Sequence, residues 1–123
     1  MNSIGKTLWL VPDMFLPESV DTAPYIGHES VCILNTGDTD CDVECTVYFC
    51  DREPLEGLHI SCPARRSVHA RMNDLCDKHG TRIPLGVPYS AAFICSVPVV
   101  IQCTRVDTTQ ENLALMSAIA YGA

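Results

Sequence analysis

The sequence predicts an all-β fold, a small antiparallel β-sandwich of short strands that forms a single domain over residues 1–123. Three observations lead to this prediction. Apolar and polar residues alternate with a period of two in most apolar segments, which is typical of half-buried strands. Proline and glycine divide these segments at spacings of roughly 8 to 12 residues, as in sandwiches and small barrels. A length of 123 residues fits one domain and leaves no room for a second.

The clearest strand covers residues 41–50, which are apolar at odd positions and mostly polar at even positions. A shorter apolar run at residues 31–34 ends in a group of turn formers at residues 35–38. Because a turn between two strand-like runs is the signature of a hairpin, we expect residues 31–50 to form one.

Four further segments have strand character, at residues 58–62, 67–72, 90–96 and 99–105. Pro98 separates the last two, and proline has no amide to donate to a central ladder, so we expect a break there.

Two segments are harder to interpret. Residues 12–27 contain Pro12, Pro17 and Pro24 and are expected to form a long loop. In the stretch 107–121, Asp107 or Thr108 could cap a helix, but the apolar positions also fit one face of a strand, and the pattern leaves both open.

Eight cysteines would suit a disulfide-bonded scaffold if the protein were exported. Only a short apolar stretch follows Lys6 before Pro12, which does not resemble a signal peptide, so we expect a cytoplasmic protein with reduced thiols. Cys41, Cys45 and Cys95 fall in phase with apolar neighbours, which indicates that they fill the core.

The formal net charge is −7, with a sequence pI near 4.8. Nucleic-acid binding depends on neutralising phosphates with Lys and Arg, so a nucleic-acid partner is not favoured.

Motifs for metal binding and catalysis are weak. No C-x-x-C pair is present, and the nearest chelating pattern, Cys76 with His79, has no identifiable partners. The phosphate-binding, nucleophile-elbow and metalloprotease motifs are also absent. We therefore expect no catalytic residue, no metal and no cofactor.

The most distinctive polar cluster lies within ten residues and consists of Arg65, Arg66, His69, Arg71, Asn73 and Asp74. Alternation places His69 and Arg71 on one strand face; Gln102 and Thr104 share a face of another strand, with Arg105 opposite. Arginine binds carboxylates and phosphates through two parallel hydrogen bonds, which suggests a site for a small polar or anionic ligand. The alternative is a solvated face with ion pairs to Asp51, Asp74 or Asp107.

Several blocks of the sequence resemble the sensory rhodopsin transducer family. They include residues 28–35 (HESVCILN), residues 47–54 (VYFCDREP), the motif PARR at 63–66 with the residues that follow it to Leu75, and the final AIAY at 118–121. The stretch from Val97-Pro98 to Gln102, Thr104, Arg105 and Asp107 belongs to the same set, and the blocks follow the family's order.

This resemblance implies a β-sandwich that assembles into a homotetramer and a C-terminal strand at residues 113–121. The family's archetype acts with a seven-helix photoreceptor, and many relatives are thought to bind small molecules, with sugars favoured. The shared polar positions carried over by motif are His28, Glu29, Arg65, Arg66, His69, Arg71, Asn73, Asp74, Gln102 and Arg105.

We therefore expect a cytoplasmic signalling module that binds a small polar molecule, such as a sugar or sugar acid, or relays a signal from the cytoplasmic face of a seven-helix receptor. A protein-interaction adaptor without a small ligand is the alternative, ahead of a Cys/His enzyme or a DNA-binding regulator. Edge strands favour self-association, for which residues 97–101 and 113–121 offer apolar surface.

Overall fold

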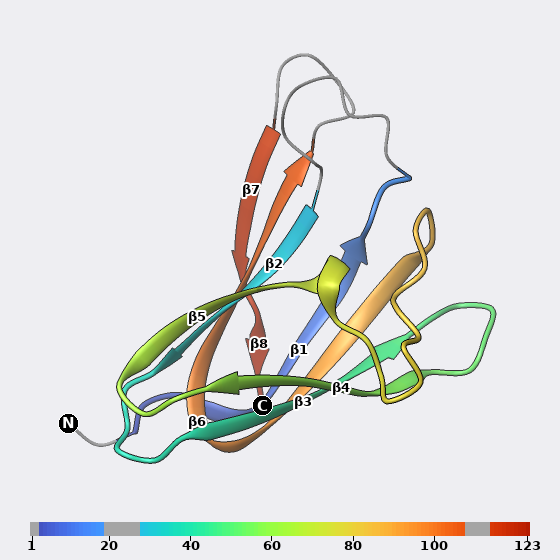
Figure 1. Ribbon diagram of the computed structural model, residues 1–123. Helices are drawn as coiled ribbons and strands as arrows, with labels where there is room; N and C mark the ends of the chain where they lie inside the picture. Colours follow the sequence, from blue (N-terminus) through green and yellow to red (C-terminus); the bar gives the residue numbers. More distant parts are fainter. Residues whose placement is uncertain (1–2, 19–27, 108–113) are drawn as a thin grey trace.

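The computed structural model describes residues 3–18, 28–107 and 114–123 (Figure 1). These residues form eight β-strands and one short 3-10 turn, with no α-helix among them, so the predicted all-β class is confirmed. Every strand pair is antiparallel. The elements are β1 (Lys6–Phe15), β2 (His28–Asn35), β3 (Cys41–Tyr48), β4 (Leu55–Cys62), β5 (Arg66–Arg71), η1 (Met72–Asp74), β6 (Pro88–Asp107), β7 (Ala114–Ile119) and β8 (Tyr121–Gly122).

Strand β6 organises the fold, because its two ends belong to different parts of the sheet. Figure 1 shows it as a long, bent strand that runs from one group of strands to the other. Its first half pairs with β1 and β3, which gives a first half-sheet in the order β4-β3-β6-β1-β8. Its second half pairs with β2 and β7, which gives a second half-sheet in the order β5-β2-β6-β7. The hydrophobic core draws buried side chains from both halves.

The continuity of β6 contradicts the expected break at Pro98. Strand β6 runs without interruption through this residue. Its pairing with β3 ends at Cys95, and its pairing with β2 begins at Val100, so Pro98 lies where the strand changes partners. The pairing of β6 with β1 also shifts register between Leu8–Ile94 and Lys6–Val99, so Pro98 lies at an irregularity of this ladder. A missing amide costs little at such a position, which explains why proline is tolerated.

The hairpin expected over residues 31–50 is also wrong. Strand β2 pairs with β5 and β6, whereas β3 pairs with β4 and β6. The turn itself exists and is held by the buried Asn35, whose Nδ2 donates to the carbonyls of Thr39 at 2.9 Å and Cys62 at 3.2 Å. The turn connects β2 of the second half-sheet to β3 of the first. The turn residues alone do not indicate whether the next strand pairs with β2 or joins the other half-sheet.

Residues 12–15 belong to strand β1, although the sequence predicted a loop from residue 12. The pairing of β1 with β6 shifts register between Val11 and Met14, so Pro12 and Asp13 form a bulge. A bulge accommodates a proline that the regular ladder would exclude. Met14 and Leu16 are fully buried beyond it. The remainder of the predicted loop, at residues 19–27, lies outside the described residues.

The C-terminal stretch adopts the strand alternative, as the resemblance implied. Strand β7 pairs with the end of β6 in a continuous register from Gln102–Ile119 to Asp107–Ala114. Asp107, one of the two residues considered as a helix cap, is the last residue of strand β6. Residues 108–113 lie outside the described residues.

The cysteines fill the core, as their phase predicted. Cys41, Cys45, Cys62, Cys95 and Cys103 are buried, and all eight cysteines are free thiols. No helix within the described segments is long and apolar enough to cross a membrane.

Candidate functional site

The register of the second half-sheet aligns polar side chains in two rows across its strands. The first row runs from Arg71 on β5 through Ser30 and Thr104 to Ser117 on β7. The second row runs from His69 through Cys32 and Gln102 to Ile119. Residues directly opposite in antiparallel strands project to the same side. We call this surface, made of Ser30, Cys32, His69, Arg71, Gln102, Thr104 and Ser117, the polar face.

The polar face points away from the core. Its neighbours in the alternation, Val31, Ile33 and Ile101, are fully buried on the other side. His69, Arg71, Gln102 and Ser117 are exposed, whereas Ser30, Cys32 and Thr104 are half-buried. The hydroxyls of Thr104 and Ser117 lie 3.0 Å apart.

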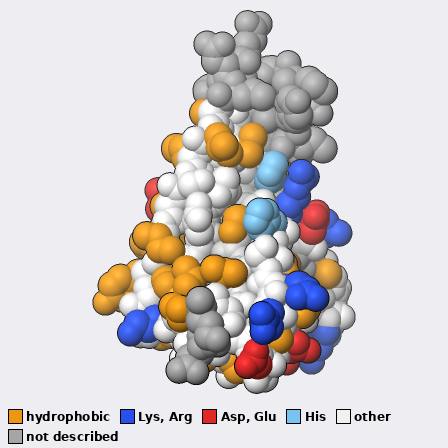
Figure 2. Space-filling model, turned by 90° about the vertical axis from the view of Figure 1, so that its left-hand side faces the viewer, with side chains coloured by type: hydrophobic (Ala, Val, Ile, Leu, Met, Phe, Trp, Pro, Cys, Tyr) orange, Lys and Arg blue, Asp and Glu red, His pale blue; other side chains and the backbone are white. Residues whose placement is uncertain are grey.

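The outward residues of these strands include no carboxylate within the described part of the chain. They comprise His28, Ser30, Cys32, Leu34, Ser67, His69, Arg71, Val100, Gln102, Thr104, Val106, Leu115, Ser117 and Ile119. Figure 2, which views the side of the molecule on which β5 and β7 lie, shows histidine and basic side chains next to one another. These described outward residues thus include one arginine and two imidazoles but no carboxylate. This composition is unusual in a chain of net charge −7, and it favours the binding of an anion.

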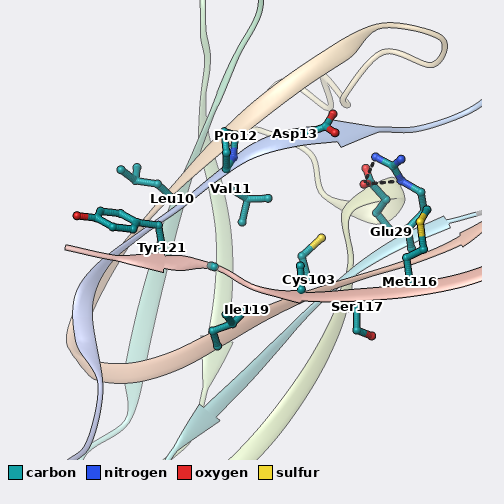
Figure 3. Close-up of a pocket in the computed structure, with 13 residues that line it drawn as sticks. Leu10, Val11, Pro12, Asp13, Glu29, Cys103, Met116, Ser117, Ile119 and Tyr121 are labelled. Atoms are coloured by element: carbon teal, nitrogen blue, oxygen red, sulfur yellow. Dashed lines mark hydrogen bonds and ion pairs between the residues drawn. The ribbon is translucent and has the colours of Figure 1, made fainter.

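Glu29 lies on the opposite, inward side of β2 and is 1% exposed. Its Oε1 accepts hydrogen bonds from the Tyr89 hydroxyl and the Phe15 amide, both at 2.8 Å. Its Oε2 accepts from Arg105 Nε at 3.2 Å and Nη2 at 3.0 Å (Figure 3). This cluster therefore links β1, β2 and both ends of β6.

The environment of Glu29 shifts two pKa values. Burial raises the pKa of the Glu29 carboxyl, although the hydrogen bond from Tyr89 and the charge of Arg105 act in the opposite direction. Burial, and the neighbouring Glu29 carboxylate, hold the pKa of the Tyr89 hydroxyl far above its ordinary range.

The predicted site residues fall into three groups. His28, His69, Arg71 and Gln102 project outward with the polar face. Glu29, Arg105 and Asn73 belong to the inward cluster, where Asn73 Oδ1 accepts the Glu29 amide at 3.3 Å. The other three lie at or near the ends of β5. Arg65 directly precedes the strand, Arg66 is its first residue, and the exposed Asp74 ends the following turn η1.

The side chains of Arg65 and Arg66 each contact a nearby group of the chain. Arg65 has a φ of 57°, and its Nη1 lies 3.9 Å from Asp38, a weak contact between exposed groups. Arg66 Nη1 donates to the Arg65 carbonyl at 2.9 Å. These contacts do not bring either arginine side chain to the polar face.

Sequence reasoning did not identify Ser30, Cys32, Ser117 or Tyr89. The first three join the polar face only through the cross-strand register, which alternation within one strand does not reveal. Tyr89 meets Glu29 across 60 residues of chain, and no local pattern marks such a pair.

Cys76 and His79 line a cleft of about 580 Å³ together with His59 and Glu44. Within residues 3–18, 28–107 and 114–123, however, no three potential ligands gather closely enough to hold a metal ion.

Comparison with known proteins agrees with the fold. Among fourteen matching chains of solved structures, the crystal structure of Thermotoga maritima 1070 is 34% identical, with a TM-score of 0.82 over 97% of this chain and 96% of that chain. The Anabaena sensory rhodopsin transducer is 39% identical, with a TM-score of 0.75 over 85% of this chain and 99% of that chain. No curated protein matches.

A family model described as Anabaena sensory rhodopsin transducer matches residues 4–122, nearly the whole sequence. Together with the identities above, this match confirms the resemblance that the sequence blocks predicted. The chain therefore belongs to the Anabaena sensory rhodopsin transducer family.

Proposed function

We propose that this protein is a cytoplasmic signalling module that binds a small anionic molecule, such as a sugar acid, on the polar face and acts by binding without catalysis. The observation that carries the proposal is the cross-strand register. It aligns Arg71, His69 and Gln102 on a surface whose outward strand residues, in the described part of the chain, include no carboxylate. Membership of a transducer family supports a role in signalling.

The chemistry of the polar face fits such a ligand. The planar guanidinium of Arg71 can hold a carboxylate or phosphate through two hydrogen bonds. Gln102, Thr104 and Ser30 can exchange hydrogen bonds with hydroxyl groups. Because neighbouring strands lie about 4.8 Å apart, a molecule of sugar size can reach side chains of β5, β2 and β6 at once.

A partner for the module is the cytoplasmic face of a seven-helix receptor, as the family description suggests. We also propose a homo-oligomer, expected to be a tetramer, that forms through β7. Among the described residues this strand pairs on one side only, with β6, and its Leu115 and Ile119 are 69% and 66% exposed. An edge strand with exposed apolar side chains is a surface that self-association would cover.

The other apolar segment expected to mediate assembly, residues 97–101, offers less surface, because only Val97, Pro98 and Val100 are partly exposed. Val99 and Ile101 are completely buried in the core of the single chain. The adaptor alternative, in which β7 contacts another protein and no small ligand binds, rests on the same exposed strand.

The experiment that separates the alternatives is a thermal-shift screen with glucose, gluconate and glucose 6-phosphate, followed by calorimetric titration of each compound that stabilises the protein. Arg71→Ala should weaken binding of the anionic compounds by about ten- to a hundredfold, since it removes a charge-assisted contact of roughly 1.5 to 3 kcal/mol. Arg52→Ala is the matched control, because Arg52 pairs with Asp51 on an exposed turn, and it should leave affinity unchanged. If no compound stabilises the protein and Arg71→Ala only lowers its melting temperature, the ligand-binding proposal fails and the adaptor alternative is favoured.

A further inference from the structure

A cleft of about 700 Å³ opens between β1 and the C-terminal strands, on the side of the sheet opposite the polar face (Figure 3). Strand β8 pairs with Trp9 and Leu10, and none of the described residues pairs with β1 on this side beyond Leu10. The volume lies within the range typical of small-molecule sites.

The walls of the cleft are mostly apolar. Val11 projects from β1, Cys103 from β6, and Met116 and Ala118 from β7, with Tyr121 of β8 at the mouth. Burial raises the pKa of Cys103 to about 11, so its thiol is neutral and acts as part of the apolar wall.

Three charged groups line the cleft, and their charges do not cancel. Glu29 and Arg105 form an ion pair at 3.0 Å and neutralise each other. Asp13, which lies in the bulge of β1, also lines the cleft and is exposed. Among the described residues it has no hydrogen-bonded or ionic partner for its carboxylate. The cleft therefore carries an excess of one negative charge, which a cation would complement.

The distance between Asp13 and Tyr121 limits the length of a molecule that could contact both residues in the cleft. Tyr121 pairs with Leu10, and Asp13 follows three residues further along β1. Three residues of strand span at most about 10 Å of backbone, and the bulge at Pro12 and Asp13 does not lengthen this span. The ring of Tyr121 and the thioether of Met116 are polarizable surfaces that accommodate a cationic or aromatic molecule.

We propose that this cleft binds a small organic cation, in which an ammonium group contacts Asp13 and an apolar body of about 10 Å lies along Val11, Met116 and Tyr121. The charged and apolar walls of the cleft lie on the other side of the sheet from the polar face, although Ser117 of that face also lines the cleft, and the cleft has the opposite charge preference. The proposal thus goes beyond the function proposed above, and the two can fail independently.

The test uses three probes that share one apolar body and differ in the charge of the head group: tryptamine, tryptophol and indole-3-propionate. Calorimetric titration should rank tryptamine above tryptophol, with indole-3-propionate weakest. Asp13→Asn should weaken tryptamine about fivefold, the size of a solvent-accessible ion pair, and leave tryptophol unchanged. Asp42→Asn removes the same charge from the exposed side of β3 and should change neither.

A second variant tests the location of the site. Ala118 lines the cleft and is exposed, so Ala118→Phe should fill the cleft without disturbing the core and abolish binding of all three probes. The proposal is overturned if indole-3-propionate binds as well as tryptamine, if Asp13→Asn and Asp42→Asn behave alike, or if Ala118→Phe binds tryptamine like the wild type. Absence of binding by every probe would also overturn it, as expected if a second copy of the chain covered the cleft.

Discussion

Glu29 shows that a polar residue grouped by sequence with exposed positions can be buried and join several strands. Its place in a family motif suggested ligand binding, but its side chain is buried and accepts hydrogen bonds from Phe15, Tyr89 and Arg105. These donors come from β1 and from both ends of β6. The residue therefore holds the two half-sheets together at this end of the molecule.

The raised pKa of Glu29 leads to a prediction about pH. A carboxyl whose pKa is higher in the folded state than in the unfolded state adds stability below the unfolded value, and this contribution is lost as pH rises through the folded value. The difference in free energy of unfolding between wild type and Glu29→Gln should therefore decrease as the pH is raised from about 4, near the unfolded pKa, toward neutrality. Urea denaturation at several pH values measures this difference. A difference that grows with pH would mean that the ion pair with Arg105 outweighs the cost of burial.

At the scale of elements, alternation located the strands well but not their partners. The period of two correctly marked β3, β4 and β5. Strands β3 and β4 each have one buried and one exposed face, and in β5 half-buried Val68 and Ala70 alternate with exposed residues. Partner choice depends on where the chain goes after a turn, and the turn at Asn35 has the same residues whether it closes a hairpin or leads to the other half-sheet. The polar face shares this limitation, since Cys32 meets His69 and Gln102 only through the register.

The strand break expected at Pro98 and the loop expected from Pro12 were both wrong, for the same physical reason. Pro98 and Pro12 both occupy strand positions where the regular ladder is interrupted, by a change of partner in β6 and by a bulge in β1. Sequence alone indicates that proline excludes a ladder position. It does not indicate that the strand continues past that position.

The dual role of β6 predicts a sharp contrast between two of its isoleucines. Ile101 is completely buried, whereas Ile94 is 54% exposed on the same strand. Ile101→Ala should lower the free energy of unfolding by about 2 to 5 kcal/mol, because it leaves a cavity between the half-sheets. Ile94→Ala should change it by less than about 0.5 kcal/mol. Chemical denaturation of both variants makes the comparison, and equal losses would show that Ile101 does not lie in the core.

At the scale of the whole molecule, strand β7 presents the exposed apolar side chains of Leu115, Met116 and Ile119. Light scattering at micromolar concentration should give the mass of a tetramer for the wild type. Replacing Ile119 by Lys places a charge on exposed β7 and should shift the protein toward smaller species. Leu85→Lys, at an exposed position outside the strands, should not. A wild-type monomer would contradict the proposed assembly.

The central claim, that the polar face is a binding site, is tested most directly by mapping where a ligand binds. Backbone amide resonances of the ¹⁵N-labelled protein would be followed during titration with gluconate, and with glucose as the uncharged comparison. The account predicts that gluconate shifts the amides of β2, β5 and the second half of β6, around Cys32, His69 and Gln102, and that glucose shifts them less. Shifts confined to the cleft beside β1, or no shifts with either compound, would contradict it.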